Sequence, residues 1–152
     1  MSIRHRLEEL GLVLPENIVP RGEYEPVVIL NGLAYVSGQV CRINDGVIKG
    51  PLTDQTPEEV LALAGRACVL RALSLLERYI GLEQVQQIVF LRGFVYGTAG
   101  GLNYSAAVDG ASRLLLDIFG DRGRHARSAI GVAGLPSDGL LEVEIVAAIA
   151  KA

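Results

Sequence analysis

The stretch His125-Ala-Arg-Ser-Ala-Ile-Gly-Val-Ala-Gly-Leu-Pro136, followed three residues later by Leu140-Leu-Glu-Val-Glu-Ile145, decides how the C-terminal part of this chain folds. Its two apolar runs flank a Gly/Pro/Ser/Asp turn, which predicts two strands, at 125–133 and 140–150. Glu142 and Glu144 share a strand face because they are two residues apart. A guanidinium near carboxylates in an apolar sheet indicates either a bound carboxylate or an ion pair between Arg127 and one of these glutamates.

Length and composition narrow the possible classes. The 152 residues predict one domain, 1–152, in which residues 1–24 form an N-terminal extension and lead-in. Half of the residues are hydrophobic, yet no apolar run reaches the roughly 18 residues that a membrane span needs. We therefore expect no membrane partner and assign the surplus apolar surface to subunit contacts. The net charge of −3 argues against nucleic acid as a partner.

The chain lacks the usual signatures of cofactor and metal enzymes. Cys41 and Cys68 have neither disulfide-framework nor metal-ligand spacing, and Cys68 is expected in the core. Phosphate-binding glycine patterns, paired-histidine metal motifs and the nucleophile elbow are missing too. We expect no cofactor and no metal. The N-terminus has no signal-peptide pattern, which favours a cytoplasmic location.

The remaining elements follow from periodicity and turn residues. Asn31-Gly32 between two β-rich runs predicts a type I′ hairpin. A long helix is expected from Pro57 to about Tyr79, with Thr56 as N-cap and Glu59 completing a capping box. The other predictions are a short surface helix at 2–10, a loop at 44–57, a strand at 87–95 and a helix at 105–119 that ends at Gly120.

The element order ββαβαββ is typical of an α+β fold in which two helices cover one face of a single sheet. The other sheet face also carries apolar residues, and no third large helix is left to cover it. We therefore expect that face to contact other subunits in a small closed ring.

Arg127 is the strongest candidate for function because its planar fork can hold a carboxylate in bidentate fashion. An ion pair with Glu142 or Glu144 across subunits is the alternative. His125 shares the strand face of Arg127 and is either a surface residue at the strand end or part of a site wall. The role of Glu144 stays open.

Four further residues have both a structural and a functional interpretation. Tyr24 precedes the first strand and serves packing or lines a cleft. Ser37 ends the second strand or offers its hydroxyl to a ligand, and Gly38 permits close backbone approach. Asp109 lies on the polar face of a helix, where solvation is the ordinary outcome.

These residues resemble the reactive intermediate deaminase (Rid, or YjgF-like) family over nearly the whole chain. The marks are Tyr24, Val36-Ser-Gly-Gln, Val108-Asp-Gly-Ala-Ser, Phe119-Gly-Asp-Arg-Gly-Arg-His-Ala-Arg-Ser, and Leu135-Pro with Glu142-Val-Glu. The extension Arg6-Leu-Glu-Glu-Leu-Gly-Leu-Val-Leu-Pro resembles the longer subgroup of this family. The resemblance implies a chorismate-mutase-like ββαβαββ mixed sheet with two helices on one face. It also implies a trimeric, barrel-like assembly with clefts between adjacent subunits.

The resemblance also implies roles. Arg127 matches the arginine that binds the substrate carboxylate, and Glu142 matches the acid that holds the attacking water. Tyr24, Ser37 and Gly38 match the cleft lining. Two positions depart from the archetype: Asp109-Gly110 stands where it has an asparagine, and Ala129 where it has a cysteine. Both departures concern the shape of the pocket and hence the substrate.

The implied activity is hydrolysis of enamine or imine intermediates such as 2-aminoacrylate to 2-keto acids and ammonia, without a cofactor, in a homotrimer. Three alternatives stay open. The chain could be a non-catalytic protein that binds small carboxylates, an endoribonuclease or translation inhibitor, or a purely structural oligomer. The acidic composition disfavours the nuclease.

Overall fold

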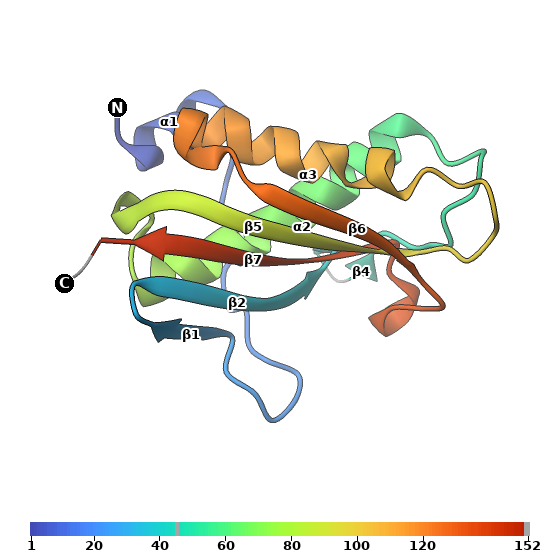
Figure 1. Ribbon diagram of the computed structural model, residues 1–152, viewed down its shortest axis with the longest axis horizontal. Helices are drawn as coiled ribbons and strands as arrows, with labels where there is room; N and C mark the ends of the chain where they lie inside the picture. Colours follow the sequence, from blue (N-terminus) through green and yellow to red (C-terminus); the bar gives the residue numbers. More distant parts are fainter. Residues whose placement is uncertain (45, 151–152) are drawn as a thin grey trace.

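The computed structural model describes residues 1–44 and 46–150 (Figure 1). In chain order the helices and strands are α1 (Ile3–Glu9), β1 (Val27–Leu30), β2 (Leu33–Val40), β3 (Arg42–Ile43), β4 (Gly46–Val47), α2 (Glu58–Tyr79), β5 (Val85–Tyr96), α3 (Tyr104–Phe119), β6 (Ala126–Val132) and β7 (Leu141–Ile149). Short 3-10 helices occupy Leu82–Gln84, Gly120–Gly123 and Pro136–Asp138.

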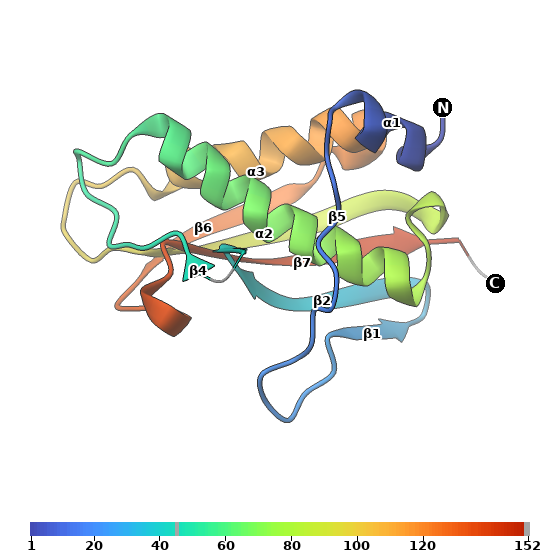
Figure 2. The ribbon, with the colours of Figure 1, turned by 180° about the vertical axis from the view of Figure 1, so that it is seen from behind.

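Five strands form one mixed sheet in the order β1-β2-β7-β5-β6. Only β5 and β6 are parallel; the other neighbours are antiparallel. The two views of Figures 1 and 2 place α2 and α3 on the same face of this sheet. The predicted α+β architecture, with a mixed sheet and two helices on one face, is confirmed.

The two C-terminal strands, although joined by a turn, are not neighbours in the sheet. β6 is an edge strand that pairs only with β5, whereas β7 lies between β2 and β5. The reason is the β5-α3-β6 crossover, which makes β6 parallel to β5 on its outer side. β7 then returns to the middle of the sheet. Arg127 is therefore in register with Leu91 of β5 rather than with Glu142 or Glu144.

The predicted N-terminal hairpin is confirmed. Leu30 faces Leu33 across the turn, and Asn31 and Gly32 both have positive φ, 51° and 75°. Positive φ at both central residues defines the type I′ turn, whose twist matches that of the strands.

The long helix ends as predicted but begins differently. It runs to Tyr79, and Gly81 follows with φ 81°. Its N-cap is Pro57, whose side chain can neither donate nor accept a hydrogen bond, so the expected capping box is wrong. The hydroxyl of Thr56 instead accepts from the amide of Thr53 at 2.9 Å. The stretch 44–57, expected as loop, also contains the two-residue β4.

The core lies between the sheet and the two long helices. Cys68 is fully buried there, as expected, and Cys41 is buried too. The backbones of α2 and α3 approach closely at Gly65, where an added Cβ would lie 2.7 Å from the amide nitrogen of Ala111. Glycine is thus required for the helix packing that covers the sheet.

The opposite sheet face is covered by neither α2 nor α3. Large apolar side chains remain accessible on it: Val28 is 50% exposed, Tyr35 47% and Ile130 40%. A groove on this face is lined by these strands' residues, including Phe90 and Val146. No helix of the described residues has the length and apolar character to cross a membrane.

Candidate functional site

Arg127 is held by α3 at the edge of the sheet. Its Nη1 donates to Asp109 Oδ1 at 2.9 Å and to Ser112 Oγ at 3.1 Å, and its Nη2 donates to Ser105 Oγ at 2.7 Å. The side chain of Arg127 is only 19% exposed. Its ion-pair partner within the chain is thus Asp109, for which solvation was the ordinary expectation, whereas Glu144 pairs with Arg92. The alternative of a pair with Glu142 or Glu144 across subunits stays a prediction.

His125 belongs to the same network. Its Nδ1 lies 2.6 Å from the carbonyl oxygen of Gly123, so this nitrogen donates. In the neutral tautomer Nε2 then accepts from the hydroxyl of Ser112 at 2.8 Å, and that oxygen accepts from Arg127. His125 therefore lies beside Arg127 in one shallow pocket and takes part in positioning the guanidinium.

Glu142 lies in a different pocket, where its carboxylate rests directly on Gly38. A Cβ at Gly38 would lie 2.7 Å from Oε2 and 2.9 Å from Cδ of Glu142. Any larger residue at position 38 would therefore overlap the Glu142 carboxylate in its present position. Burial, and then the nearby charge of Glu144, raise the pKa of Glu142. A raised pKa makes the ionised carboxylate a stronger base and hence a better proton acceptor.

Glu144 is engaged elsewhere. Its carboxylate forms an ion pair with Arg92 across the β5–β7 pair. Within residues 1–44 and 46–150, Glu142 takes part in no ion pair. Of the two carboxylates that share this strand face, Glu142 is therefore the one available for chemistry.

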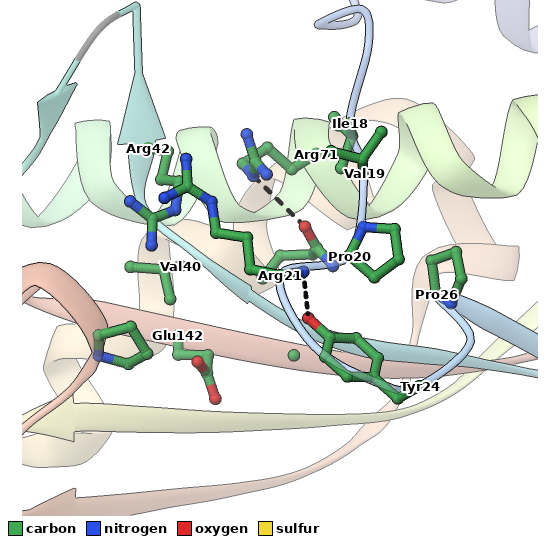
Figure 3. Close-up of a pocket in the computed structure, with 13 residues that line it drawn as sticks. Ile18, Val19, Pro20, Arg21, Tyr24, Pro26, Val40, Arg42, Arg71 and Glu142 are labelled. Carbon is green, nitrogen blue, oxygen red and sulfur yellow. Dashed lines mark hydrogen bonds between the residues drawn. The ribbon is translucent and has the colours of Figure 1, made fainter.

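The other predicted cleft residues divide between the two regions. Tyr24 and Gly38 line the pocket of Glu142 (Figure 3). Ser37 donates to the carbonyl oxygen of Glu25 at 2.7 Å and lines the neighbouring groove on the open face. Ala129 lies two residues after Arg127 on the same face of β6, opposite Gly93 of β5.

The structure also brings together residues that the sequence did not point to. Arg21, Arg42 and Arg71 line the pocket of Glu142 (Figure 3). They come from the lead-in, from β3 and from the middle of α2. Residues so far apart in the chain share no spacing or motif, so no sequence signal could have grouped them. In the described part of the chain no cluster of His, Cys, Asp and Glu is arranged to hold a metal ion.

Two half-sites result. Arg127, Asp109 and His125 surround one pocket, and Glu142, Tyr24 and Gly38 surround another. Arg127 is not among the residues that line the Glu142 pocket, and Glu142 is not among those that line the Arg127 pocket.

Comparison with known proteins is consistent with this architecture. Residues 4–149 match the family model described as "YjgF/chorismate_mutase-like, putative endoribonuclease". "Protein TCP17" of Trypanosoma cruzi is 36% identical, covering 91% of this chain and 88% of that protein.

Two solved structures are similar over almost their full length. A "putative endoribonuclease" of Shewanella oneidensis has a TM-score of 0.91 at 31% identity, covering 98% of this chain and 100% of that one. The protein Atu1372 of Agrobacterium tumefaciens, described as having unknown function, has a TM-score of 0.86 at 28% identity, with 97% and 94% coverage. With a family match across nearly all of its residues, the chain belongs to the YjgF/chorismate mutase-like family.

Proposed function

We propose that this protein hydrolyses 2-imino acids and their enamine tautomers to 2-keto acids and ammonia, in a cleft formed between two copies of the chain. The observation that carries this proposal is the complementarity of the two half-sites. One contains the guanidinium of Arg127, which in a single chain is bound to α3, and the other contains a half-buried glutamate of raised pKa beside Tyr24. A small 2-imino acid needs both groups within a few ångströms of each other.

The chemistry asks little of the protein. An enamine first takes a proton at its terminal carbon, which converts it to the iminium form with a C=N bond. Arg127 binds the substrate carboxylate, and Glu142 takes a proton from water as the water oxygen adds to the C=N carbon. The resulting carbinolamine receives that proton on nitrogen. The C–N bond then breaks, ammonia leaves with the electron pair, and loss of the hydroxyl proton completes the 2-keto acid. Protein groups supply the binding and every proton transfer.

The uncovered sheet face supports assembly. Val28, Tyr35 and Ile130 are exposed apolar side chains spread over this face from β1 to β6, and soluble monomers rarely expose much apolar surface. A head-to-tail contact that closes into a ring joins two different patches of neighbouring copies, and we propose that these patches are the β6 edge of one copy and the Glu142 pocket of the next. We propose a homotrimer on this basis. The cytoplasmic location and the independence from cofactors stay predictions.

The test is ammonia release from 2-aminoacrylate generated in situ, measured with purified protein. We expect acceleration by the wild type and a loss of at least about a hundredfold in kcat/KM for Arg127→Ala, because the carboxylate anchor is gone. Arg113→Ala, an exposed arginine on the same helix as Asp109, serves as the matched control and should keep full activity. Full activity of Arg127→Ala would sink the proposal.

Two other outcomes correspond to the alternatives. Binding of small carboxylates without turnover of any imine indicates a carboxylate-binding protein. Cleavage of RNA that disappears in Arg127→Ala but not in Arg113→Ala indicates a nuclease, as the names of some relatives suggest. The net charge of −3 provides no general attraction for RNA.

A further inference from the structure

The pocket that contains Glu142 is also a concentration of positive charge. It lies between the lead-in around Pro20, the irregular end of β2, and the helix α2 (Figure 3). Its empty space, open mouth included, is about 780 Å³. Arg21, Arg42 and Arg71 all line it, whereas Glu142 is the one acidic residue among its lining residues within 1–44 and 46–150.

Arg71 is fixed in this pocket by a buried amide. Gln39 is 6% exposed, and its amide nitrogen donates to the carbonyl oxygen of Ser37 at 3.0 Å. Its amide oxygen accepts from Nε of Arg71 at 3.3 Å. This single bond uses Nε and leaves both terminal nitrogens of Arg71 without a hydrogen bond to any described residue. They form the free fork that matches a carboxylate in geometry.

The three guanidinium groups are close enough to repel one another. Burial lowers the pKa of Arg71, and the charges of Arg42 and Arg21 lower it further. In residues 1–44 and 46–150 none of the three forms an ion pair, and the polar partner of Arg42 is only the hydroxyl of Ser137 at 3.2 Å. With three cations against one carboxylate, the pocket has an excess of positive charge that a bound anion would neutralise.

We propose that Arg21, Arg42 and Arg71 bind a second acidic group of the ligand, so that this protein favours 2-imino and 2-keto acids with a carboxylate at the far end of the side chain. This inference rests on the proposed function for the position of the first carboxylate, at Arg127 of a neighbouring copy. A dicarboxylate would then span the cleft, with its reactive carbon beside Glu142. The ligand class is thus set by residues that the family motifs do not include.

The experiment uses stable 2-keto acids, the products of the proposed reaction, so that it does not depend on turnover. Binding of 2-oxoglutarate and of 2-oxopentanoate, which has the same chain length but no terminal charge, is measured by calorimetry on the wild type. We expect 2-oxoglutarate to bind at least about tenfold more tightly, since charge-assisted hydrogen bonds to arginine contribute this much or more. Added salt should reduce the preference.

Variants assign the effect to these residues. Arg71→Gln and Arg21→Gln should each remove most of the preference for 2-oxoglutarate. Arg21 is exposed, so its substitution tests the idea without touching the core. Arg66→Gln, an exposed position on the same helix as Arg71, is the matched control and should keep the preference.

The outcomes separate the two proposals. Equal affinity for both keto acids in the wild type, or a preference that survives in Arg21→Gln and Arg71→Gln, overturns this inference even if monocarboxylic imines are hydrolysed. A preference that depends on these arginines supports it, even if no imine is turned over and the proposed activity fails.

Discussion

Arg127 and Glu142 point to opposite faces of the same sheet. Arg127 is in register with Leu91 of β5, and Glu142 with Phe94. These two positions on β5 are three residues apart with no register shift between them, so their side chains alternate to opposite sides. The hydrogen bonds of Arg127 to α3 agree with this assignment. A site that uses both residues must therefore be built from two chains.

Mixed assemblies test this relationship directly. Arg127→Ala and Glu142→Gln chains are each expected to be inactive alone. Mixed in equal amounts, they should recover about a quarter of wild-type activity, because one neighbouring pair in four joins an intact Arg127 to an intact Glu142 in a closed head-to-tail ring. The measurement is ammonia release after co-expression or after unfolding and refolding together. Activity that stays at the level of the separate variants would contradict a shared site.

Gly38→Ala should impair activity more than stability. The added methyl group would overlap the carboxylate of Glu142, at 2.7 Å from Oε2, and a flexible side chain can move away at small cost. We expect kcat to fall at least tenfold while the free energy of unfolding changes by less than about 1.5 kcal/mol. Denaturant unfolding and steady-state kinetics measure the two effects. Gly46→Ala, where nothing lies within 4 Å of the new Cβ, is the control and should change neither.

Glu142 should make stability depend on pH. Its pKa in the folded protein is raised above the ordinary value of 4.5, so the unfolded chain loses this proton first as pH rises. Stability therefore decreases as pH rises through these two pKa values, and the loss persists at neutral pH. Glutamine does not ionise, so Glu142→Gln should abolish this pH-dependent loss of stability.

The expected result is a higher Tm for Glu142→Gln than for the wild type at pH 7.5, with a difference that shrinks toward pH 4. Thermal unfolding followed by circular dichroism is the measurement. Glu23→Gln, at an exposed position, is measured beside it as a second substitution of glutamate by glutamine. If the Tm difference between Glu142→Gln and the wild type were smaller at pH 7.5 than at pH 4, the result would contradict a raised pKa for Glu142.

Gly65→Ala should destabilise the fold through helix packing. The new Cβ would lie 2.7 Å from the amide nitrogen of Ala111, and backbone cannot move aside as a side chain can. We expect a loss of about 2 kcal/mol in the free energy of unfolding, despite the better helix propensity of alanine. Gly100→Ala has open space around the new Cβ and should stay within about 0.5 kcal/mol of the wild type. Equal stability of the two variants would contradict this prediction, because it would mean that α2 and α3 can move apart to accept the extra methyl group at little cost.

Local sequence signals were sufficient for most elements. Asn31-Gly32 specifies its turn through positive φ, and Gly81 and Gly120 end their helices with positive φ as well. These features depend on neighbouring residues alone, which is why they could be predicted. The capping box at Thr56 failed because Pro57, rather than Thr56, occupies the N-cap, and the threonine hydroxyl accepts from Thr53 instead.

The amino-acid sequence by itself determined the class of fold, the two helices over one sheet face, and the candidate pair Arg127 and Glu142, because periodicity, turn residues and motifs are local. Only the tertiary structure decided which groups meet. The crossover through α3 places β6 at the sheet edge, where Arg127 forms its ion pair with Asp109 of α3. The irregular pairing of β2 between Val36 and Gln39 lies where Gly38 meets Glu142 and Gln39 holds Arg71. Strand order and register depend on contacts between residues distant in the chain, and no short stretch of sequence contains them.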